Sequence, residues 1–104
     1  MAFDLDLTLK DMAAAAAGVF EKESKKVGKA ARGVLQDRRE ALEAIAAARL
    51  AQEIDDEELE IQLADEKLAF RTGMLMVKAL TKASIQKAAN AAFAVLTKAI
   101  KAAL

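Results

Sequence analysis

The amino-acid sequence predicts an all-α protein. Alanine supplies 26 of the 104 residues, and leucine, glutamate and lysine are also frequent. These four residue types are among the strongest helix formers. Proline is absent, so no position is barred from a helix by its ring. Tyrosine and tryptophan, which favour strands, are absent as well. A chain of this length suits one small domain.

The clearest boundary in the chain is the acidic run at 54–58. Its four consecutive carboxylates favour the start of a helix, where the dipole attracts negative charge and Asp55 or Asp56 can cap the first turn. The same charges would oppose the end of a preceding helix. We therefore predict a main turn near 52–56 and a helical hairpin of two long arms, broken into three to four helices, within a single domain over 9–104.

The first arm begins with a segment whose apolar and polar residues alternate. We assign 1–8 to an N-terminal arm that ends in a helix cap at Thr8, and a short strand pairing with a second copy is the alternative. The first helix is predicted over Leu9–Val27, because lysines and then Gly28 follow the apolar face there. The apolar pattern continues beyond this point, so Gly28 and Gly33 can bend the helix without ending it.

The second arm has more apolar surface than a hairpin can bury. Two seams run along opposite faces: Leu59, Leu63, Phe70, Met74 and Val77 form one, and Ile61, Ala64, Leu68, Leu75 and Ala79 form the other. Over 85–104 the polar stripe is narrow, and the pattern changes phase near Ser84, which can cap a further helix. Gly73 is another candidate break. Either several helices or further subunits must cover these faces, so we predict assembly into a multi-helix bundle as a homo-oligomer, a dimer or larger.

The charges are sorted along the chain although the net charge is zero. Residues 40–66 hold ten acidic groups and one basic group, whereas 67–104 hold seven basic groups and no acidic one. This arrangement favours pairing within or between copies, and Lys87, Lys98 and Lys101 are expected to meet the acidic middle. The zero net charge and the few aromatic residues argue against nucleic-acid binding.

Two arginines lie on an otherwise apolar face. Arg38 and Arg49 are eleven residues apart, three helical turns, and share a face with Leu42 and Ile45. Such arginines either extend to the rim of the face or meet carboxylates of another helix. Together with the large apolar residues they form the predicted interface, which comprises Arg38, Arg49, Phe70, Met74, Phe93, Leu96 and Ile100.

The residue types exclude most enzyme chemistry. Histidine, cysteine and tyrosine are absent, which removes the common nucleophile–base pairs and the usual zinc ligands. The carboxylates at 53–60 fit a solvated helix face better than a cation site. We therefore expect no enzyme activity, catalytic residue, metal or cofactor.

The expected function is a helical oligomerisation or protein-interaction module: a scaffold, an adaptor or a structural subunit. The alternative is a protein that acts at a membrane surface, because the basic, amphipathic segment 85–104 fits an interfacial helix. A cytoplasmic location is expected, since neither an N-terminal signal nor a long uncharged apolar run is visible.

Overall fold

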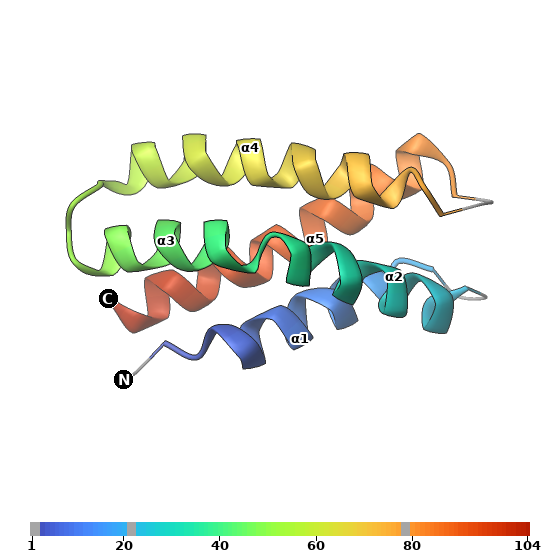
Figure 1. The fold of residues 1–104 in the computed structure, drawn as a ribbon, viewed down its shortest axis with the longest axis horizontal. Coiled ribbons are helices and arrows are strands. Elements are labelled where there is room, and N and C mark those ends of the chain that lie inside the picture. Colours follow the sequence, from blue (N-terminus) through green and yellow to red (C-terminus); the bar gives the residue numbers. More distant parts are fainter. Residues whose placement is uncertain (1–2, 21–22, 78–79) are drawn as a thin grey trace.

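A computed structural model describes residues 3–20, 23–77 and 80–104, and within these ranges helix is the only regular secondary structure (Figure 1). This confirms the all-α prediction. The described residues form five helices rather than the predicted three to four: α1 (Leu5–Ala17), α2 (Ser24–Asp37), α3 (Arg39–Leu50), α4 (Asp56–Met74) and α5 (Lys82–Ala103). The fold is 41 Å long and 23 × 19 Å across.

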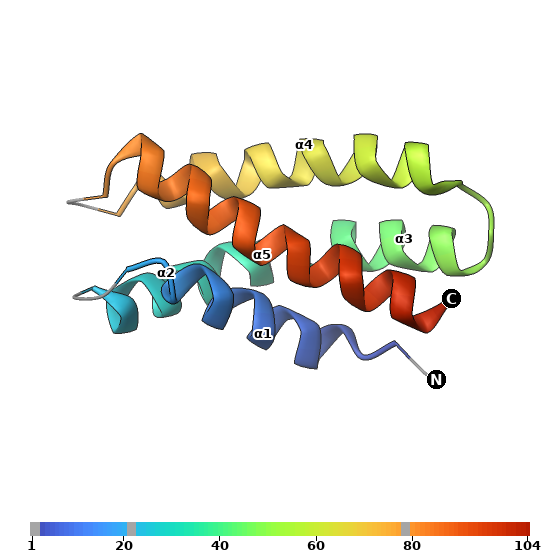
Figure 2. The ribbon, with the colours of Figure 1, turned by 180° about the vertical axis from the view of Figure 1, so that it is seen from behind.

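The helices run up and down in four antiparallel passes: α1, then α2 with α3, then α4, then α5 (Figures 1 and 2). α1 packs against α2 and α5, and α4 packs against α2, α3 and α5. This is the arrangement of a four-helix bundle in which one pass is divided. The turn between α3 and α4 lies at 51–55, where the sequence analysis placed the main turn. Each predicted arm, however, folds back on itself, between α1 and α2 and again between α4 and α5.

The first helix begins and ends earlier than predicted. The side chain of Asp4 accepts a hydrogen bond of 3.1 Å from the backbone N–H of Leu7, so residues 5–8 of the predicted arm are already helical. Thr8 is buried instead of capping, and its hydroxyl donates to the Asp4 carbonyl at 2.7 Å. α1 ends at Ala17, whereas the prediction extended the helix to Val27.

The N-caps of α4 and α5, and the positions of the glycines, show which of the predicted helix boundaries are present in the structure. Asp55 caps α4 by accepting a hydrogen bond of 2.9 Å from the N–H of Glu58. Thr81, not Ser84, caps α5, because the Thr81 hydroxyl oxygen accepts from the N–H of Ser84 at 3.1 Å. The glycines considered as breaks at positions 28, 33 and 73 all lie inside helices. The second pass is instead divided at Arg38, the residue between α2 and α3.

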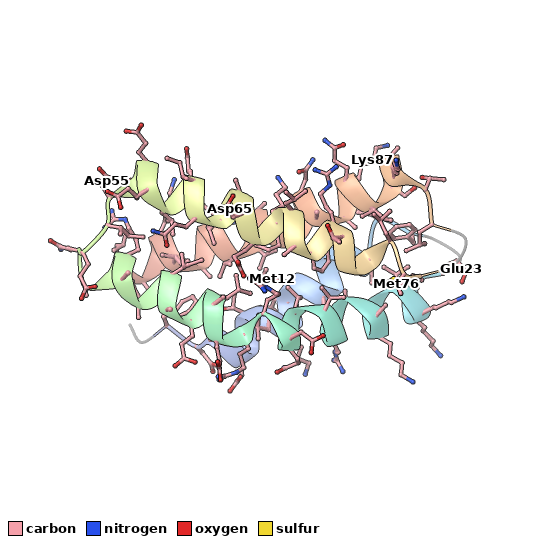
Figure 3. All side chains as sticks on the ribbon, turned by 45° about the horizontal axis from the view of Figure 1, so that its top comes forward. Met12, Glu23, Asp55, Asp65, Met76 and Lys87 are labelled. Atoms are coloured by element: carbon pink, nitrogen blue, oxygen red, sulfur yellow. The ribbon has the colours of Figure 1, made fainter. Side chains whose placement is uncertain are left out.

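The core contains large apolar residues from all five helices and a set of alanines from α1, α2, α3 and α5. Met12 of α1, in the centre of Figure 3, is fully buried, as are Leu35, Leu42 and Leu59. Ala13, Ala16, Ala88, Ala89 and Ala92 are buried on α1 and α5. Small side chains let helix backbones approach closely, which suits the tight packing of these two helices. The single chain therefore covers most of the apolar circumference of α5.

Candidate interaction surface

Five of the seven predicted interface residues lie inside the chain. Phe70, Met74, Phe93, Leu96 and Ile100 are all buried. The rings of Phe70 and Phe93 pack edge to face, with centroids 6.0 Å apart and an angle of 65° between their planes. The apolar faces that suggested an interface at these residues are covered by other helices of the same chain. Each predicted arm folds back on itself, so the five described helices are available to pack against one another.

The two predicted arginines both meet carboxylates of α4. Arg38 donates from Nε to Glu66 Oε1 at 2.9 Å and from its guanidinium Nη2 to Glu66 Oε2 at 2.5 Å. Arg49 donates from Nε to Asp56 Oδ1 at 2.9 Å. The arginines therefore join the second pass of the bundle to α4 within one chain. Of the two pairs, Arg38–Glu66 is the more enclosed, because the Glu66 side chain is only 9% exposed.

Two arginines have raised pKa values because each is paired with a carboxylate. The hydrogen bonds to Glu66, and then its negative charge, raise the pKa of Arg38 above its ordinary value. Asp6 raises the pKa of Arg39 in the same way. A raised pKa means that the stabilisation is fully present below the ordinary arginine pKa and is lost only as the pH rises past the folded value. Arg38, beside Glu66, and Arg39, beside Asp6, therefore both stay positively charged at any pH near neutrality.

Sequence reasoning missed Glu66, although a signal for it was present. Glu66 follows Leu63 by three residues and precedes Phe70 by four, so it shares their face of α4. A carboxylate inside an apolar seam needs a partner, because burying an unpaired charge is costly. Arg38, which also lies on an apolar face, is the partner that satisfies this requirement.

Replacing Glu66 with glutamine should lower the free energy of unfolding by about 1–2 kcal/mol, measured by urea titration. A hydrogen-bonded charge pair is worth about 1.5–3 kcal/mol, and the solvent exposure of the arginine reduces this figure. Glu43→Gln is the matched control, since Glu43 pairs with Arg39 on an exposed helix face. The control should change stability by no more than about 0.5 kcal/mol. Equal effects of the two changes would contradict a special role for Glu66.

The opposite face of α4 carries exposed apolar residues. Ile61, Leu68 and Leu75 are 59%, 57% and 52% exposed, and they follow one another at intervals of seven residues along the chain. We name these three residues the outer stripe. They belong to the second predicted seam, whose last member, Ala79, lies outside the described residues. Figure 1 shows α4 along one edge of the bundle, with no other helix on its outer side.

The charges beside the outer stripe change sign along α4. Residues 56–65 include five acidic groups and no basic one, whereas 67–74 include two basic groups, Lys67 and Arg71, and no acidic one. Glu66, between the two segments, is buried on the inner face. Figure 3 shows that α4 spans the length of the bundle, with Asp55 before the helix at one end and Met76 after it at the other. α4 therefore presents an apolar line with an acidic first half and a basic second half.

A groove of 570 Å³ lies between α4 and α5, which diverge toward the C-terminal end of the chain (Figure 2). Its apolar lining comprises Leu63, Ala64, Phe93 and Ala94, and its charged lining comprises Glu60, Lys67, Lys98 and Lys101. Lys98 and Lys101 were expected to pair with the acidic middle of the chain. In the part of the chain that the structure describes, however, all four ion pairs use arginine.

Two further properties of the described residues bear on the function. Among the described residues, no group of three or more acidic side chains is placed to hold a metal ion. None of the helices in the described ranges is both long enough and apolar enough to cross a membrane. No family model, curated protein or solved structure matches this chain. The function must therefore be argued from the surface itself.

Proposed function

We propose that this protein is a non-catalytic helical module that associates with protein through the outer stripe of α4, first of all with further copies of itself. The observation that carries the proposal is the exposure of Ile61 and Leu68 on one face of α4 and of Leu75 at its C-cap, each more than half exposed. Single exposed apolar residues are common on folded proteins, but a line of them is typical of an interface.

The spacing of the outer stripe supports a helical partner. Apolar residues repeated every seven positions face the same direction on a helix and form one edge of a coiled-coil contact. Between the stripe positions this face carries two small exposed residues, Ala64 and Thr72, and two charged residues, Asp65 and Arg71. The Thr72 hydroxyl already donates to the Leu68 carbonyl at 3.0 Å, so it needs no other partner. A second helix can therefore approach this face closely.

The exposed surface of the bundle favours a protein partner over a lipid membrane. The segment 85–104, on which the membrane alternative depends, has Ile85, Phe93, Leu96 and Ile100 buried in the bundle. An interfacial helix would have to leave the core before these residues met a membrane. The outer stripe is already exposed, but the acidic half of α4 lies beside it. Anionic lipid would repel these carboxylates, whereas a protein partner can pair with them.

The test is the solution mass of the chain and of a stripe variant, measured by multi-angle light scattering at micromolar concentrations. We expect the unmodified protein to be a dimer or larger. Leu68→Gln should shift the mass toward the monomer, because it places an amide in the middle of the apolar contact. Leu7→Gln is the matched control: Leu7 is 55% exposed but lies on α1, away from the stripe.

The control variant should keep the mass of the unmodified protein, and circular dichroism should show that both variants remain helical. A monomer for the unmodified chain across the whole range would overturn the self-association proposal. Equal loss of mass in both variants would show that association does not use the outer stripe.

A further inference from the structure

We infer that the outer stripe binds the same stripe of a second copy, with the two α4 helices antiparallel and a twofold axis near Leu68. The inference rests on the proposed function and specifies the partner and its orientation. It is a self-complementary contact, in which each copy offers the same surface to the other.

The apolar residues determine where the axis lies. Leu68 is the midpoint of the stripe, seven residues from Ile61 and seven from Leu75. An antiparallel pair centred at Leu68 sets the two Leu68 side chains together. It also sets Ile61 of each copy beside Leu75 of the other. Any axis displaced by a heptad along α4 would leave at least one of the three residues without an apolar partner.

The charges determine the orientation. A parallel pair would also match apolar residues, but it would place the acidic segment 56–65 of one copy beside the same segment of the other. Like charges in such contact are unfavourable, and specific helix pairs avoid them. In the antiparallel pair centred at Leu68, Asp65 of each copy instead lies beside Arg71 of the other, and the acidic residues 56–60 of the two copies lie far apart. Only the antiparallel pair is complementary in both apolar surface and charge.

The exposed position of α4 makes the contact sterically accessible. α4 lies along one edge of the bundle in both views, and its inner face is held by α2, α3 and α5 (Figures 1 and 2). Two copies can therefore meet along α4 without any rearrangement of their cores. Because exposed charges contribute to the pairing, the association should weaken as salt screens them.

The chain has no cysteine, so single cysteines can report which residues meet. We would prepare Ile61→Cys, Leu68→Cys and Leu75→Cys, oxidise each mildly, and measure the disulfide-linked dimer on a non-reducing gel. A disulfide needs Cβ atoms about 3.5–4.5 Å apart. In the antiparallel pair, position 61 is separated from position 61 of the other copy by fourteen residues of helix, about 21 Å.

We expect Leu68→Cys to cross-link with itself. Ile61→Cys and Leu75→Cys should cross-link several-fold more when mixed with each other than when oxidised alone. Leu7→Cys on α1 is the control for random collision, and all four sites are exposed, so the bundle should fold in each variant. Equal self-linking at 61, 68 and 75, with no gain on mixing, would mean a parallel pair and would overturn the inference.

The two proposals fail in different ways. If the solution mass depends on Leu68 but the cross-links give the parallel pattern, the module still associates through the outer stripe and only the orientation is wrong. If no variant links above the Leu7→Cys control, the second copy is not the partner on this face. That result also overturns the inference, and the light-scattering comparison decides the proposed function separately.

Discussion

Replacing Phe70 with alanine should lower the free energy of unfolding by about 3–5 kcal/mol, the range for removal of a fully buried aromatic side chain. Phe70 has no exposed surface, and its ring packs edge to face on Phe93 at the contact of α4 with α5. A domain of this size is typically stable by about 5–15 kcal/mol. The change should therefore remove a large share of the total, measured by urea titration monitored by circular dichroism.

The matched control for this prediction is Leu68→Ala. Leu68 lies two residues away on the same helix but faces solvent, so its replacement in the monomer should alter stability by no more than about 0.5 kcal/mol. The double variant with Phe93→Ala should show a coupling of about 0.5–1.5 kcal/mol between the rings. A loss below about 1 kcal/mol for Phe70→Ala would contradict the core position of this residue.

The start of α4 and its apolar seams could be predicted because both depend on neighbouring residues. A carboxylate that can cap, followed by further carboxylates in the first turn, defines a helix start in local chemistry alone, and the cap is Asp55. The apolar spacing of Leu59, Leu63, Phe70 and Met74 likewise indicated one buried face, and the structure buries all four. Periodicity and capping operate within a few residues of the chain, so they can be identified from sequence.

The end of α1 could not be predicted, because competing signals had similar strength. The run Ala13–Ala17 favours helix without interruption, and the lysines before Gly28 resemble a helix end. The chain nevertheless leaves the helix at Gly18, and Gly28 lies inside α2. Folding back at this point lets α2 and α5 both cover α1. The stabilisation comes from contacts between residues that are distant in the sequence, and the apolar periodicity of a single helix gives no information on such contacts.

The candidate site was only partly predictable for a related reason. The sequence showed Arg38 and Arg49 on an apolar face and a second apolar seam on α4, but not which seam faces the core. Glu66, 28 residues beyond Arg38, decides this, because its ion pair holds one face of α4 against the second pass of the bundle. The opposite face, with Leu68, is then left exposed. Phe70 and Met74 of the predicted interface thus lie on the buried side of α4, opposite the exposed Leu68.

Replacing Gly73 with alanine should lower the free energy of unfolding by about 1–2 kcal/mol, because overpacking a well-filled contact costs about 1–3 kcal/mol and the gain in helix propensity offsets part of it. A Cβ atom at Gly73 would lie 2.8 Å from Cγ1 of Val34 and 3.0 Å from Cγ2. Valine is branched at Cβ and has few rotamers, so it cannot easily turn away. The added methyl group would therefore push α4 away from α2, and this cost exceeds the gain of up to about 1 kcal/mol in helix propensity.

The neighbouring Gly33→Ala variant separates crowding from propensity. Among the described residues, no atom outside the chain neighbours and the local helix backbone lies within 4 Å of a Cβ placed at Gly33, so this change in the middle of α2 should raise stability by about 0.5–1 kcal/mol. The crowding account further requires that Val34→Ala cost less in the Gly73→Ala background than in the unmodified chain, because the valine is then the obstacle. Thermal and urea unfolding of the four chains in this cycle measure that difference. If both glycine variants gained stability equally, the close approach of α2 and α4 at Gly73 would be refuted.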